Sequence, residues 1–131
     1  MLVLGNRNTI CCWLIVLSSN DSVTKILIHN LPCNGACVSS TTTFSDSMTV
    51  YLGKRKVEIK QIGRAHTAGD SVIWVPDSQT MFTGDIVEYH SACYCGDGHF
   101  EEWGATLDAV KAYDPQSIAP GRGDALVGRE M

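Results

Sequence analysis

Two side chains in the second half of the chain are candidates for binding a metal ion. His66 follows a predicted strand and enters a loop that contains two glycines, at residues 63–69. Asp85 follows Gly84 at the predicted end of another strand. Side chains at neighbouring strand ends are held by the sheet yet face open space, so an imidazole and a carboxylate there form half of a zinc or two-metal site. The alternative is that His66 caps a loop and Asp85 makes a turn, and spacing alone favours it.

A second group of candidate ligands follows Asp85. Two histidines, two cysteines and an aspartate lie close together in the chain: His90, Cys93, Cys95, Asp97 and His99. His90 and His99 offer replacement imidazole ligands, and the cysteines offer thiolates. The alternative is a polar surface loop with incidental thiols. Asp70, which follows the His66 loop, is predicted to orient His66 as a hydrogen-bonding neighbour.

These side chains must be positioned by a predicted sheet and one helix. Apolar residues and turn signals predict five short strands, at residues 48–52, 56–62, 71–75, 80–83 and 117–119. The apolar residues Trp103, Leu107 and Val110 share one helical face, which predicts a helix over residues 101–113 that ends before Pro115. Two further strands are predicted in the irregular N-terminal region, at residues 10–17 and 23–29.

Composition indicates one globular domain over residues 1–131, because 44% of the residues are hydrophobic and can build a core. The net charge is −4, and the basic residues are scattered apart from one triplet at residues 54–56, so we expect no nucleic-acid partner. The apolar run at residues 10–17 is too short to span a bilayer, and we expect no membrane partner. Six cysteines without a convincing signal peptide predict reduced thiols and a cytoplasmic location.

Several motifs occur together in an order that resembles a known family. Three segments are similar to the H-T-x-G-D … P … F-T-G-D pattern of metallo-β-lactamase-fold hydrolases, at residues 63–70, 72–76 and 81–85. Trp103, Leu107 and the Pro-Gly-Arg-Gly loop at residues 120–123 fit that family's closing helix and final loop. The resemblance covers residues 45–127, and residues 1–44 form an atypical N-terminal segment.

The resemblance implies an α/β fold that is half of an αββα sandwich, with a mixed sheet and one main C-terminal helix. It also implies that the residue at His66 binds one metal ion. The residue at Asp85 would bridge two ions that share an activated water. The expected cofactor is therefore zinc, as one or two ions, with manganese or iron as alternatives.

The chain departs from the family pattern at two important places. The family's upstream H-x-H-x-D-H motif is absent, and the only upstream histidine is His29. The last family ligand is often the histidine of a P-G-H-G loop, but this chain has Arg122 there, which offers no lone pair to a metal. The chain therefore resembles a truncated form of the family.

The sequence predicts a metal-dependent hydrolase that acts on a small-molecule ester, either a phosphoester or another activated ester. The expected catalytic residues are His66, Asp85 and Arg122, with Arg122 pairing with an anionic group. The alternative is a non-catalytic folded remnant with an assembly role or none. Because one half of a sandwich leaves a sheet face bare, we also expect a homodimer in which the second copy covers that face.

Overall fold

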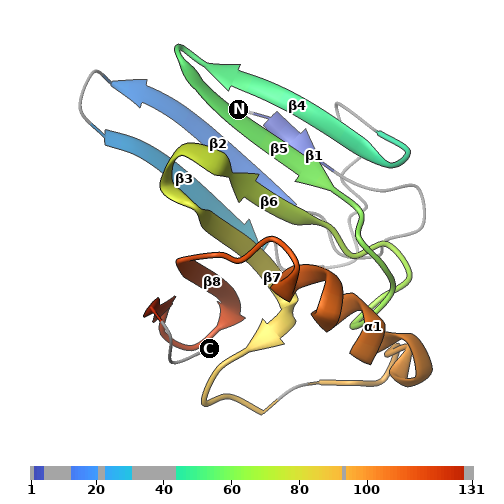
Figure 1. The fold of residues 1–131 in the computed structure, drawn as a ribbon. Helices are drawn as coiled ribbons and strands as arrows, with labels where there is room; N and C mark the ends of the chain where they lie inside the picture. Colours follow the sequence, from blue (N-terminus) through green and yellow to red (C-terminus); the bar gives the residue numbers. More distant parts are fainter. Residues whose placement is uncertain (1, 5–12, 21–22, 31–43, 93, 129–131) are drawn as a thin grey trace. The chain divides into compact units, whose positions relative to one another are not determined.

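The computed structural model describes residues 2–4, 13–20, 23–30, 44–92 and 94–128, and it divides the chain into two compact units, Met1–Ser45 and Asp46–Met131 (Figure 1). The first unit holds an antiparallel sheet in the order β1-β2-β3, made of Leu2–Leu4, Trp13–Asn20 and Val23–Asn30. The predicted strand at residues 23–29 is confirmed. The start of the one predicted at residues 10–17 lies outside the described residues, and β1 was not predicted.

The second unit is a mixed sheet of six strands with one α-helix. The strands follow the order β4-β5-β6-β7-β8-β9, with bounds Ser47–Leu52, Arg55–Lys60, Val72–Val75, Thr80–Glu88, Ser117–Arg122 and Leu126–Val127. Neighbouring strands are antiparallel except β7 and β8, which are parallel and are joined through helix α1, Phe100–Lys111. A short 3-10 helix, Pro76–Ser78, separates β6 from β7. The predicted α/β fold with a mixed sheet and one C-terminal helix is confirmed.

The core of this unit lies between the sheet and α1. Alternate residues of the central strands point to the helix, so Val72, Trp74 and Met81 pack in one buried cluster with Val110 of α1 and Ile118 of β8. Met81 and Val72 are completely buried. This cluster fixes the helix on the sheet, and with it the two loops that flank the helix.

Several predicted boundaries were wrong, and those of β7 and β8 change the site. Strand β7 continues past Gly84 to Glu88, because Gly84 takes a left-handed conformation (φ 55°) and the strand re-pairs after a bulge. Strand β8 runs on through Arg122, so most of the predicted Pro-Gly-Arg-Gly loop is strand. Asp85 and Arg122 therefore lie on paired strands instead of in loops. The helix ends at Lys111, earlier than predicted.

The face of β5 that carries Glu58 is charged. The carboxylate of Glu58 forms ion pairs with Lys56 and with Lys60, whose Nζ lies 2.6 Å away. Hydrogen bonds from Lys56 and then Lys60 lower the pKa of Glu58, and the bond to Glu58 raises the pKa of Lys60. This group of charges is therefore mutually stabilising at neutral pH.

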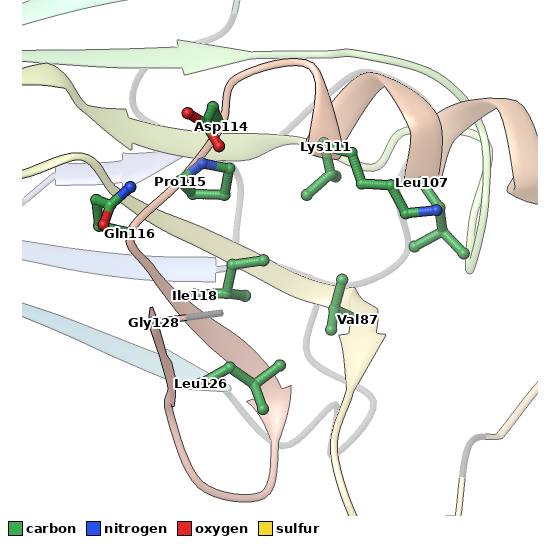
Figure 2. Close-up of a pocket in the computed structure, with 10 residues that line it drawn as sticks. Val87, Leu107, Lys111, Asp114, Pro115, Gln116, Ile118, Leu126 and Gly128 are labelled. Carbon is green, nitrogen blue, oxygen red and sulfur yellow. The ribbon is translucent and has the colours of Figure 1, made fainter. Parts of the chain in front are cut away.

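An apolar pocket of about 710 Å³ opens beside α1, at β8 and β9 (Figure 2). Its lining includes Leu107 and Val110 from the helix, and Val87, Ile118 and Leu126 from the strands. The described residues that line it include no histidine or cysteine, so the pocket is separate from the predicted metal ligands. Among the described residues, no helix has the length and apolar character needed to cross a membrane.

Candidate metal site

The imidazole of His66 and the carboxylate of Asp85 face each other at the predicted site. His66 Nε2 lies 4.0 Å from Asp85 Oδ2, and the two side chains are only 13% and 11% exposed. Nε2 is buried and has no hydrogen-bond partner among the described residues. Two donors that bind one zinc ion at roughly 2.0–2.2 Å each can stand this far apart. The pair is therefore spaced as two ligands of a single ion would be.

The loop that carries His66 is stabilised by Asp70. The Asp70 carboxylate accepts hydrogen bonds from the Thr67 backbone N–H at 3.0 Å and from the Thr67 hydroxyl at 2.6 Å. The described hydrogen bonds of Asp70 thus go to the residue after His66 and not to the imidazole itself. Asp70 positions His66 through the backbone turn.

Helix α1 supports the same loop from its other side. The Thr106 hydroxyl donates to the Arg64 carbonyl at 2.8 Å, and the Trp103 ring meets the His66 ring edge-on, with centroids 6.2 Å apart. The Trp103 indole N–H donates to the Ile86 carbonyl at 3.0 Å, one residue beyond Asp85. Trp103 therefore connects the His66 loop to the strand that carries Asp85.

Asp85 is enclosed by the neighbouring strand β8. A Cβ atom added to Gly121 would lie 2.0 Å from Asp85 Oδ1 and 2.6 Å from the Asp85 backbone nitrogen. Only glycine fits at such a distance. The glycine of the Pro-Gly-Arg-Gly segment thus allows β8 to approach the Asp85 carboxylate closely.

Arg122 lies on the other side of Asp85. Its Nη2 atom is 3.8 Å from Asp85 Oδ2, and its Nη1 atom donates to Glu88 Oε1 at 3.0 Å. The Glu88 side chain is only 4% exposed, and its second oxygen, Oε2, is buried without a partner among the described residues. The guanidinium is thus placed between two carboxylates.

Glu88 was not among the predicted site residues. The prediction ended the strand at Thr83, which left Glu88 in an undefined loop. The signal that could have identified it is the apolar pair Ile86 and Val87, which predicts that the strand continues after the Gly84 bulge. Glu88 then pairs in register with Arg122.

The other predicted ligands are not gathered around His66 and Asp85. His90 is exposed, has a left-handed backbone (φ 50°) and stacks on Tyr89. His99 precedes α1, and its backbone N–H donates to the Ala65 carbonyl at 2.7 Å. Cys93 lies outside the described residues. Within the described part of the chain, no three His, Cys, Asp or Glu side chains form a group that could hold a metal ion.

The donor chemistry fits one ion but does not complete a catalytic site. His66 offers a buried nitrogen and Asp85 an oxygen, which are both zinc ligands. Catalytic zinc usually has three protein ligands and an open position. The third ligand is not supplied by the residues that the structure describes.

Comparison with known proteins shows which fold the chain shares with them. No family model matches the chain. A metallo-β-lactamase type 2 from Bacteroides fragilis is 33% identical over 86 residues, which cover 62% of this chain and 34% of that protein. Another from Pseudomonas aeruginosa is 32% identical over 66 residues, which cover 50% of this chain and 26% of that protein. The chain thus spans about a third or less of the length of these relatives.

Solved structures agree with these relatives. Metallo-β-lactamase IND-7 is 26% identical, with a TM-score of 0.60 over 66% of this chain and 42% of that chain. DIM-1 metallo-β-lactamase is 24% identical, with a TM-score of 0.61 over 67% of this chain and 43% of that chain, and this likeness concerns the fold. The chain therefore carries part of the metallo-β-lactamase fold, as its motifs predicted. Its relatives are metal-dependent hydrolases by name.

Proposed function

We propose that the chain is a metal-dependent hydrolase that binds zinc, as one or two ions, through His66 and Asp85. The supporting observation is the buried, unpartnered His66 Nε2 atom, which faces the Asp85 carboxylate at 4.0 Å. A buried imidazole nitrogen without a partner costs free energy, and a shared ion removes that cost. Manganese and iron are the alternative ions.

The chain's own residues would bind and orient the reacting groups. A bound zinc ion would polarise the scissile group and lower the pKa of a water molecule. His66 supplies the Nε2 lone pair in an orientation fixed by its loop, and Asp85 supplies negative charge. The Trp103 ring packs against the His66 ring in a T-shaped contact and restricts the orientation of the imidazole. Arg122, which is 41% exposed, is the group that would meet an anionic part of the substrate.

The proposed substrate is a small-molecule ester, either a phosphoester or another activated ester. An activated ester releases a weakly basic leaving group such as a phenolate or phosphate, so cleavage does not require a strong general acid.

Metal analysis of the purified full chain tests the ligand assignment. We expect stoichiometric zinc in the unmodified protein and its loss in both His66→Ala and Asp85→Ala. Asp108→Ala is the matched control, because it removes an exposed carboxylate that is not a predicted ligand and should keep the metal. Equal zinc in all four proteins would refute the assignment.

Hydrolysis assays test the activity. We expect turnover of p-nitrophenyl acetate or bis(p-nitrophenyl) phosphate that a chelator removes and added zinc or manganese restores. Activity that survives chelation but is lost on thiol alkylation would instead identify a cysteine nucleophile, with Cys93 and Cys95 as the candidates.

The second candidate is a folded, non-catalytic remnant with an assembly role or none. It is favoured by the lack of a third ligand among the described residues and by Arg122 in the family's ligand-bearing loop. Zinc binding without turnover of any ester, in protein whose metal content is confirmed, would support this candidate over the hydrolase.

We further propose that the chain is a cytoplasmic homodimer. Strand alternation places Val57, Ile59, Ile73 and Val75 on the sheet face opposite the α1 core. These side chains are only 1–6% exposed within one chain, so the proposal rests on the resemblance to one half of a two-layer sandwich and not on a bare apolar face. A second copy supplies the other layer through a closed two-fold interface. Light scattering at micromolar concentration should give the mass of a dimer, and a stable monomer would refute the interface.

A further inference from the structure

The cluster formed by Asp85, Glu88 and Arg122 contains a positive charge of its own. The Arg122 guanidinium lies 3.8 Å from Asp85 Oδ2 and 3.0 Å from Glu88 Oε1. With His66 neutral, two carboxylates and one guanidinium leave the cluster with one net negative charge. One divalent ion would therefore already make it positive, and a second would add to that repulsion.

The backbone around Arg122 allows it little movement away from this place. A Cβ atom on Gly123 would lie 1.8 Å from the Tyr89 carbonyl oxygen, and the Tyr89 N–H donates to the Arg122 carbonyl at 3.0 Å. On the other side, Gly121 is packed against Asp85. Arg122 is thus held on β8 between a close contact with β7 and one with Tyr89, the residue that follows β7.

Glu88 in turn fixes the direction of the side chain. Its carboxylate is almost completely buried, and a buried charge requires a partner. Among the described residues, Arg122 is the ion-pair partner of Glu88. Because Nη1 is bonded to Glu88, the other terminal nitrogen, Nη2, is the one directed at Asp85.

We propose that Arg122 is a built-in counter-cation that weakens metal binding at Asp85 and limits the site to one ion, on the His66 side. The proposal rests on the proposed function, because it takes His66 and Asp85 as the metal ligands. Arg122 acts here through Asp85 and is a residue that sets metal affinity and stoichiometry. Glu88 is the positioning residue that holds it.

Zinc titration of the full chain tests this role. Arg122→Gln removes the charge and keeps a polar side chain of moderate length, while Arg122→Lys retains the charge. We expect the zinc Kd of Arg122→Gln to fall by about tenfold or more and that of Arg122→Lys to stay close to that of the unmodified protein. The difference in zinc Kd between Arg122→Gln and the unmodified protein should shrink in high salt, because dissolved ions screen the charge of a partly exposed guanidinium. A purely structural effect of the substitution would not depend on salt in this way.

A double variant separates the charge effect from a new ligand. In Arg122→Gln the freed Glu88 carboxylate could itself bind zinc and tighten the site. Arg122→Gln combined with Glu88→Gln removes that carboxylate and also the need for a buried ion pair, so it remains informative if the single variant folds poorly. We expect the double variant to bind zinc more tightly than the unmodified protein but less tightly than Arg122→Gln, because it loses the guanidinium directed at Asp85 and also one negative charge. A return to the original Kd would overturn the proposal.

The remaining outcomes separate this proposal from the proposed function. An unchanged Kd in Arg122→Gln, with zinc still lost in His66→Ala, would overturn the role of Arg122 and leave the metal site intact. Zinc bound by Arg122→Gln but not by the unmodified protein would support the role of Arg122 and refute the hydrolase. No zinc in any variant would overturn both.

Discussion

Replacing Gly121 with alanine tests how closely strands β7 and β8 approach each other at the candidate metal site. The added Cβ would lie 2.0 Å from Asp85 Oδ1 and 2.6 Å from the Asp85 backbone nitrogen. Rotation of the Asp85 side chain relieves the first contact, but the second involves backbone. Strand β8 must therefore shift by nearly 1 Å, and such overpacking costs roughly 1–3 kcal/mol. We expect the free energy of unfolding to fall by that amount.

The assay is urea denaturation followed by tryptophan fluorescence, to which Trp74 and Trp103 of the second unit contribute. Gly104→Ala is the matched control, since its added Cβ would have no atom within 4 Å and the position is inside α1. Alanine there should stabilise the helix by about 0.5–1 kcal/mol. If Gly121→Ala proves as stable as the control and binds zinc equally well, the close strand approach at Asp85 is refuted.

Three further substitutions have defined outcomes. Arg122→His removes the guanidinium and places an imidazole there, and we expect zinc binding tighter than in Arg122→Gln, because the loss of charge and the added ligand act together, measured by competition with a chromophoric chelator. Trp103→Phe leaves the Ile86 carbonyl without its donor, and urea denaturation should show a loss of about 1–2 kcal/mol. Hydrogen bonds from Lys56 and Lys60 lower the pKa of Glu58 below its ordinary value of 4.5. The ionised Glu58 carboxylate therefore stabilises the fold at any pH above 4.5, and this stabilisation is lost as the pH falls through the lower pKa of the folded state. Glu58→Gln should accordingly lower stability at neutral pH by less than about 1 kcal/mol, and urea denaturation should show this loss shrinking as the pH falls through the lowered folded pKa.

The sequence allowed the elements to be predicted better than their ends. Periodicity identified α1 and the strands of the second unit except the two-residue strand β9, because apolar alternation and helical spacing are local properties. The bulge at Gly84 is a tertiary feature, since the strand continues only because β8 pairs with it on the far side. The prediction that the strand ended at Thr83 therefore hid Glu88, and with it the partner of Arg122.

The candidate site was likewise predicted only in part from local sequence patterns. His66 and Asp85 were predicted from motif order, and the structure brings them within 4.0 Å of each other. The burial of Glu88 and the position of the guanidinium depend on the pairing of β7 with β8, which no local pattern in the sequence reports. Whether His90 and His99 bind metal stays a prediction, although the described residues do not gather them with the His66–Asp85 pair.

The parallel pairing of β7 and β8 has a consequence for the order in which the second unit folds. Strands β4 to β7 are consecutive antiparallel neighbours, so the segment that carries both His66 and Asp85 closes through short loops. Strand β8 reaches β7 only after the chain has passed through residues 89–116, and the longer closure has a greater entropic cost. Local contacts form before distant ones, so we expect amide protection to develop in β5 to β7 before β8 in pulse-labelling experiments. The ligand pair would then exist for a time during refolding without Arg122 beside it, and zinc present at that stage would meet a more negative site than zinc added to the native protein.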